Sequence, residues 1–208
     1  MTAREEILRR VRSAHVPAPQ WGTRREYSQV RDHADRLGQF VQRVENYKAT
    51  VVRTTPDGVA AAVATCLGDA RTVVVPPGLD PSWVPEGLDT VQDEPPLRAD
   101  ELDAVDAVLT CAVVGIAETG TIVLDHTAGM GRRALTLVPD LHGCVVTADQ
   151  VGGDVPEAVA RLSASVKSGR PLTWISGGSA TVDIELQRVE GVHGPRTLRV
   201  VLVESHTS

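Results

Sequence analysis

The sequence is poor in aromatic residues and in cysteine. Phenylalanine, tryptophan and tyrosine make up 3% of the 208 residues, so the core must be built from Val, Leu, Ile and Ala. The three cysteines, Cys66, Cys111 and Cys144, are far apart in apolar surroundings, and no Cys-x-x-Cys motif occurs. This spacing excludes a zinc ribbon and the common iron–sulfur cluster motifs. We expect three free thiols that pack as small hydrophobic side chains in a reducing compartment.

Lysine is also scarce, since Lys48 and Lys167 are the only two. The 21 basic residues are outnumbered by 27 acidic ones, which gives a formal net charge of −6 and no general attraction to nucleic acids or anionic membranes. The uncharged run 107–117 is far shorter than the roughly 20 residues of a membrane-spanning helix. The charged N-terminus lacks the apolar segment of a secretory signal. We therefore expect a cytoplasmic protein with no membrane span and no nucleic-acid partner.

The order of hydrophobic patterns predicts an α/β fold. Apolar residues at helical spacing in the first quarter predict a helical extension over residues 1–48, followed by one α/β domain over residues 49–208. Within that domain, short apolar runs alternate with helical patterns at 57–67 and 157–167, which favours a largely parallel sheet flanked by helices. The predicted strands are residues 49–54, 72–76, 88–91, 105–114, 120–125, 142–148, 172–175 and 196–205.

Two loops that follow predicted strands are candidates for a functional site, because ligands of open α/β sheets bind beyond the carboxyl ends of strands. The first, "VVGIAETGT", places Glu118 in a turn with Thr119 and Gly120 after the strand at 105–114. A partly desolvated carboxylate there has the raised pKa that acid–base or nucleophilic chemistry needs. The alternative is a turn glutamate that accepts hydrogen bonds from nearby backbone N–H groups.

The second loop, "ISGGSATVDIE", follows the strand at 172–175 and combines hydroxyls with two glycines. A helical turn that begins near Thr181 would complete a small anion cradle, although an acidic first turn would repel the anion. The alternative is an ordinary Gly-Ser turn before a capped helix. The candidate ligand-binding residues of this loop are Ser176, Gly177, Gly178, Ser179, Thr181 and Asp183.

Three further side chains complete the candidate site. Arg132 and Arg133 can hold a carboxylate or phosphate through their planar guanidinium groups, or they can begin a helix and pair with Asp125 or Asp140. His193, in the tight turn "GVHGP", can direct its imidazole into a cleft. No two histidines stand three or four residues apart, so we predict no metal site, and a triad of Ser179, His193 and Asp183 lacks the Gly-x-Ser-x-Gly turn.

Four motifs in the same order, "IAETGTIVL", "GRRALTLVPDLH", "SGGSATVDIEL" and "GVHGPRTLRVVLV", resemble the lactate utilization protein C family, whose shared module is the LUD domain. The resemblance covers roughly residues 45–205 and implies the fold of ribose-phosphate isomerase, glucosamine-phosphate deaminase (NagB) and coenzyme A transferases. Relatives tend to have proline at the position of Gly178, where glycine makes the loop more flexible, and alanine at that of Val182.

The resemblance also implies a function. It implies an accessory subunit for the oxidation of L-lactate to pyruvate, acting beside iron–sulfur sister proteins. The sequence has no cluster motif and no dinucleotide-binding fingerprint, so we expect no cofactor in this chain. An alternative is a stand-alone enzyme that acts on a small carboxylate, phosphate or coenzyme A thioester, with Glu118 as nucleophile or base. Whether the chain is only a ligand-sensing or structural module also stays open.

Overall fold

The computed structural model describes residues 2–14, 35–182 and 188–205. Its centre is a parallel sheet of six strands in the order β1-β12-β7-β4-β2-β3. The long central strands β7 and β12 pair from Leu141↔Thr197 to Thr147↔Val203. The strands of this sheet are β1 (Thr50–Thr54), β2 (Thr72–Val74), β3 (Asp89–Val91), β4 (Ala107–Cys111), β7 (Leu141–Thr147) and β12 (Thr197–Val203).

A second, smaller sheet of four strands lies over one face of the first, in the order β8-β5-β6-β9. β5 and β6 form an antiparallel hairpin, β6 pairs antiparallel with β9, and β5 pairs parallel with β8. The bounds are β5 (Val114–Ile116), β6 (Thr121–Leu124), β8 (Val151–Gly152) and β9 (Thr173–Ile175). A separate hairpin joins β10 (Ala180–Val182) and β11 (Arg188–Glu190).

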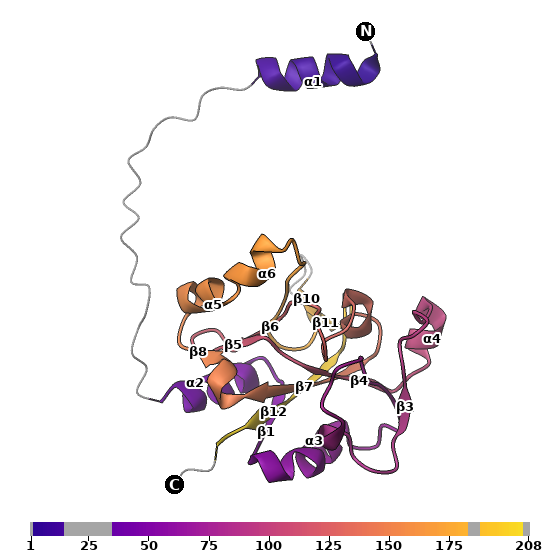
Figure 1. Cartoon of the computed structure of the whole chain (residues 1–208), viewed down its shortest axis with the longest axis vertical. Coiled ribbons are helices and arrows are strands. Elements are labelled where there is room, and N and C mark those ends of the chain that lie inside the picture. Colours follow the sequence, from indigo (N-terminus) through magenta and orange to yellow (C-terminus); the bar gives the residue numbers. More distant parts are fainter. Residues whose placement is uncertain (1, 15–34, 183–187, 206–208) are drawn as a thin grey trace.

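The two sheets and the helices form successive layers, as Figure 1 shows. Helix α3 (Val59–Leu67) packs on the outer face of the large sheet, against residues such as Leu109, Val145 and Val201. The inner face packs against the small sheet, and α5 (Val155–Arg161) and α6 (Ser163–Lys167) lie between β8 and β9 in the chain. α5 and the end-cap residue Leu162 cover the outer face of the small sheet. α4 (Ala99–Asp103) lies beside β3, and α1 (Ala3–Ser13) has no buried residue.

Burial of both faces explains the sequence of the central strands. In β7 the side chains of Cys144 and Val146 enter the core between the sheets, whereas Val145 faces α3. Alternating side chains of a strand point to opposite faces, so a strand covered on both sides is a continuous apolar run. The predicted α/β fold with a largely parallel sheet flanked by helices is confirmed.

Helix α2 (Arg36–Asn46) enters the core between the two sheets. The Asp35 carboxylate caps the helix by accepting a hydrogen bond from the Gly38 N–H at 2.8 Å. Phe40 and Val44, one turn apart, are fully buried against residues of both sheets. The predicted division into an extension at 1–48 and a domain at 49–208 stays a prediction.

Two predicted elements are corrected by the structure. The run at 105–114 is not one strand, because the chain leaves the large sheet after Cys111 and enters the small sheet at Val114. Both pieces are buried, so the hydrophobic pattern carries no sign of the break. The helical turn expected near Thr181 is instead strand β10, whose β-branched Thr181 and Val182 suit a strand. Asp183 lies outside the described residues.

No helix in the part of the chain that the structure describes is both long enough and apolar enough to cross a membrane.

Candidate functional site

Glu118 lies in the turn of the β5–β6 hairpin. Its backbone N–H donates to the Gly153 carbonyl at 3.0 Å, and its side chain is half-buried. The turn closes at Gly120, which has a φ of 64° and packs so closely on α2 that a Cβ there would come within 2.6 Å of the Arg43 carbonyl carbon. Only glycine fits both the backbone conformation and this contact. The hairpin turn is therefore fixed against α2.

The two loops singled out from the sequence lie at the same end of the small sheet. Strands β5 and β9 flank β6, and each ends where its loop begins. Their hydroxyls form a chain, in which Thr121 Oγ1 lies 2.7 Å from Thr119 Oγ1 and 2.8 Å from Ser176 Oγ. Thr119 of the first loop is thereby connected to Ser176 of the second.

A cavity of about 360 Å³ opens beside the second loop. Its lining includes Trp174, which is 43% exposed, and Leu198 at the start of β12. Among the residues that the structure describes, no aspartate or glutamate lines this cavity. Its polar side chains include Arg133, Thr136, His142, Ser176, Ser179 and His193.

The second loop is held in place by the turn that contains His193. Ser179 is the centre of this contact, because its N–H donates to the Pro195 carbonyl at 2.8 Å and its Oγ accepts from the His193 N–H at 3.0 Å. Gly178 packs against the same segment, and a Cβ there would lie 2.3 Å from the Arg196 carbonyl oxygen. Gly177, Gly178, Ser179 and His193 are thus brought together around the cavity. Thr181 lies in β10.

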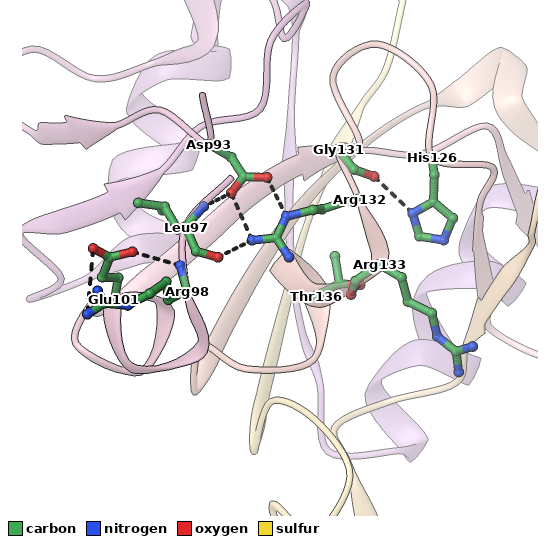
Figure 2. Close-up of polar contacts among 9 residues, drawn as sticks. All are labelled: Asp93, Leu97, Arg98, Glu101, His126, Gly131, Arg132, Arg133 and Thr136. Atoms are coloured by element: carbon green, nitrogen blue, oxygen red, sulfur yellow. Dashed lines mark hydrogen bonds and ion pairs between the residues drawn. The ribbon is translucent and has the colours of Figure 1, made fainter. Parts of the chain in front are cut away.

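Arg132 and Arg133 point in opposite directions, as Figure 2 shows. Arg132 donates two hydrogen bonds to the Asp93 carboxylate, from Nε to Oδ2 at 2.7 Å and from a terminal nitrogen to Oδ1 at 3.0 Å. The same terminal nitrogen also donates to the Leu97 carbonyl. Burial raises the pKa of Asp93, but the hydrogen bonds from Arg132 and from the Leu97 N–H outweigh burial and leave the pKa below its usual range. Arg132 therefore serves an internal ion pair.

The guanidinium of Arg133 is exposed and makes no hydrogen bond or ion pair with residues 2–14, 35–182 or 188–205. It lines the 360 Å³ cavity and also a second cavity of about 630 Å³. Asp93 and Arg132 line this second cavity together with His126, whose Nδ1 lies 2.9 Å from the Gly131 carbonyl. Arg133 is thus the cation of the pair that faces open space.

His142 lines the first cavity, although it is not among the site residues predicted from the sequence. It lies in β7, is 1% exposed, and its Nε2 is 2.8 Å from Thr110 Oγ1. Burial lowers the pKa of His142 to about 4, so the imidazole is neutral at neutral pH. The sequence could have indicated this position, because His142 lies two residues before Cys144 in a predicted strand. Side chains two residues apart in a strand point to the same face, which here is the face toward the small sheet.

Glu118, Thr119, Gly120 and Arg132 do not line the first cavity. The arrangement around it combines a guanidinium, two imidazoles and hydroxyl groups without an opposing carboxylate from the described residues, which suits a small anion. Within those residues, no three His, Cys, Asp or Glu side chains gather in a way that holds a metal ion.

Comparisons with known proteins identify the family of the chain. The LUD domain family matches residues 80–203. A lactate utilization protein C from Deinococcus radiodurans is 54% identical over 170 residues, which is 82% of this chain and 80% of that protein. One from Halalkalibacterium halodurans is 26% identical, over 96% of this chain and 94% of that protein.

A solved structure also has this fold. The crystal structure of a DUF162 family protein from Deinococcus radiodurans superposes with a TM-score of 0.74 at 47% identity, and the match covers 85% of this chain and 99% of that one. The resemblance found in the four sequence motifs is thereby confirmed, and the chain belongs to the LUD domain family.

Proposed function

We propose that this chain is a lactate utilization protein C-like subunit that takes part in the oxidation of L-lactate to pyruvate, together with iron–sulfur partner proteins. The observation that carries the proposal is the 54% identity, over most of both chains, to a protein named lactate utilization protein C. The proposal places the chain in the cytoplasm, a reducing compartment that suits its three free cysteines.

The composition of the 360 Å³ cavity supports a small carboxylate as the ligand. Arg133 supplies a permanent positive charge, and Ser176 supplies a hydroxyl. A bound carboxylate would meet no negative side chain from the described residues. The cavity is therefore compatible with a lactate-sized anion.

The positions of the cysteines support a role for partners in electron transfer. Cys66, Cys111 and Cys144 come from α3, β4 and β7, and among the described residues no three His, Cys, Asp or Glu side chains gather in a way that holds a metal ion. Iron–sulfur partner proteins would accept the two electrons that lactate loses on conversion to pyruvate.

The alternative, a stand-alone enzyme with Glu118 as nucleophile or base, gains no support from the cavities, because Glu118 lines neither of them. The proposal therefore predicts that a Glu118→Gln variant still supports growth on L-lactate. A folded Glu118→Gln protein that failed to do so would favour the alternative.

Complementation tests the proposed function. In a bacterium whose own lactate utilization protein C gene is deleted, expression of this chain is expected to restore growth on L-lactate and to leave growth on glucose unchanged. Affinity purification of the chain from lactate-grown cells is expected to recover iron–sulfur proteins. Oxidation of lactate by the purified chain alone, with an artificial electron acceptor, would contradict a subunit that depends on partners.

A further inference from the structure

The exposed hydrophobic side chains of the chain are unevenly distributed. Among the described residues, nine large apolar or aromatic side chains are exposed, of which three lie on α1 and two on α5 and α6. The remaining four border the 360 Å³ cavity and are between 36% and 44% exposed. We call these four side chains the apolar rim: Tyr47, Leu137, Trp174 and Val192.

The apolar rim is assembled from four separate segments. Leu137, which follows a 3-10 helix, and Trp174 of β9 both line the cavity. Val192 lies in the facing turn, directly before a histidine that lines the cavity. Tyr47 caps the end of α2 and packs against Gly177 of the cavity lining, where a Cβ would lie 2.5 Å from Tyr47 Cβ. The fold therefore gathers these side chains around one opening.

The composition of the rim is typical of a protein–protein interface. Tryptophan and tyrosine are enriched among the residues that dominate binding at such interfaces, and neighbouring exposed apolar groups mark interaction sites. The whole sequence contains one phenylalanine, three tryptophans and two tyrosines. The exposure of Tyr47 and Trp174 at the same opening therefore uses a large share of the aromatic side chains of the chain.

The charge at the opening limits the kind of partner. Arg133 is exposed, lines the cavity and makes no ion pair with residues 2–14, 35–182 or 188–205. No aspartate or glutamate from these ranges lines the cavity. The opening therefore complements an acidic surface and repels a basic one.

Two occupants that the chain itself could supply have an unfavourable charge. In a two-fold contact centred on the rim, a second copy would place its own Arg133 against the first. Helix α1 has an exposed apolar stripe, but it carries four arginines and only two glutamates. Both would bring positive charge to a cationic opening.

The proposed function provides an occupant with the opposite charge. Conversion of L-lactate to pyruvate releases two electrons and two protons, and the proposed function assigns the electrons to iron–sulfur partner proteins. A cluster that is held by cysteine thiolates carries net negative charge. Because the electrons leave from the ligand in the cavity, the accepting cluster has to approach the opening of that cavity.

We propose that the apolar rim is the docking surface for the iron–sulfur partner, which covers the cavity opening with an acidic face and brings its cluster close to the bound ligand. The two electrons of each oxidation pass to the partner's clusters, and the two protons are released to solvent. This inference rests on the proposed function and names the surface through which the partner acts.

Affinity purification of the full chain from lactate-grown cells tests this surface. Peptide mass spectrometry identifies the recovered proteins, and iron and acid-labile sulfide per mole of chain measure the clusters. Trp174→Ala should lower the recovered iron and sulfide at least about tenfold, the effect of truncating a central aromatic side chain. Tyr47→Ala should lower them about fivefold, although Tyr47 does not line the cavity. Val159→Ala is the control, because Val159 is 52% exposed but lies on α5, and it should behave like the wild-type chain.

Hydrogen exchange on the wild-type chain gives an answer that needs no substitution. The amides of residues 173–179 and 191–194 should exchange more slowly in the recovered complex than in the isolated chain. Those of α5 should be unchanged, because this helix lies outside the rim. Analytical ultracentrifugation of the isolated chain tests the second copy as the occupant, and we expect a species whose mass is the same in the wild type and in Trp174→Ala.

Equal recovery of iron–sulfur proteins by the wild type, Trp174→Ala and Tyr47→Ala, or unchanged exchange at residues 173–179, would overturn the docking surface. Self-association of the isolated chain that Trp174→Ala abolishes would also overturn it, because a second copy would then cover the rim. Restored growth on L-lactate together with equal recovery would reject only the surface. Recovery that depends on the rim, without restored growth, would reject only the function, and a wild-type chain that recovers no iron–sulfur protein would reject both.

Discussion

Arg132 and Arg133 show how the same side chain takes different roles at adjacent positions. Arg132 lies against Asp93, whose carboxylate is 8% exposed and depends on this guanidinium for compensation. Arg133 begins a short 3-10 helix over Arg133–Thr136, which turns it toward the cavities. The double arginine in the sequence leaves both roles open, because the partner, Asp93, comes from a loop 39 residues earlier.

A pair of substitutions separates the two roles. Arg132→Gln should lower the free energy of unfolding by about 2 kcal/mol, because it leaves the Asp93 carboxylate without its charged donor. Arg133→Gln should change it by less than about 0.5 kcal/mol, since the side chain is exposed and unpaired among the described residues. Urea denaturation followed by circular dichroism measures both. Equal losses in the two variants would contradict this assignment of roles.

Gly178 gives a second prediction. Gly178→Ala should destabilise the chain by about 1–3 kcal/mol, because its Cβ would lie 2.3 Å from the Arg196 carbonyl oxygen and force the two loops apart. Gly194→Ala, in the facing turn, is the control, since its Cβ would meet Ser179 Cβ at an ordinary 3.6 Å. Thermal unfolding of the two variants compares them. If both melt like the wild-type chain, the close approach of the loops does not constrain Gly178.

The strands could be predicted from the sequence more readily than the breaks between them. The strands β7 and β12 stand out in the sequence because their burial on both faces of the large sheet gives them runs of adjacent apolar residues. The same property hides the break between β4 and β5, since the chain stays buried while it changes sheets. Local pattern also gives no information on long-range partners. The cavity is lined by residues of β7 and β9, which belong to different sheets, so its lining could not be predicted from local patterns.

The helices α1 and α2 provide a contrast that stability measurements can test. Both have apolar residues at helical spacing, but none of the residues of α1 is buried, whereas Phe40 of α2 is fully buried between the sheets. Deletion of residues 2–14 should change the free energy of unfolding by less than about 0.5 kcal/mol. Phe40→Ala should lower it by about 3–5 kcal/mol. A large loss on deletion of α1 would mean that its exposed Ile7, Leu8 and Val11 have a partner in solution.

The aliphatic core of the molecule also contains a few buried polar side chains. Two sheets enclose the main core, and His142 and Thr110 are polar members of the face between them. Asp125 is similarly buried beside α6, where burial raises its pKa but hydrogen bonds from Ser165, Thr127 and Arg170 outweigh that effect and lower it. Such groups make the stability of the entire fold depend on pH, because their pKa values differ between the folded and unfolded chain.

The folded chain should lose stability in two successive steps as the pH falls. His142 has a folded pKa of about 4, below the value of about 6.5 in an unfolded chain, so only the unfolded state takes up this proton between these two pH values. The free energy of unfolding should therefore fall by up to about 3 kcal/mol from this residue between pH 6.5 and 4, and no further below. Asp93 and Asp125 have lowered pKa values, so their contribution is present above about pH 4 and disappears at more acidic pH.

Urea denaturation at a series of pH values between 7.5 and 3 distinguishes the two steps. His142→Gln should flatten the curve between pH 6.5 and 4 and leave the acidic step in place, because glutamine does not titrate. Asp93→Asn should reduce only the acidic step, whatever it costs at neutral pH through its lost ion pair with Arg132. An unchanged slope between pH 6.5 and 4 in His142→Gln would mean that this imidazole takes up a proton in the folded chain as readily as in the unfolded chain.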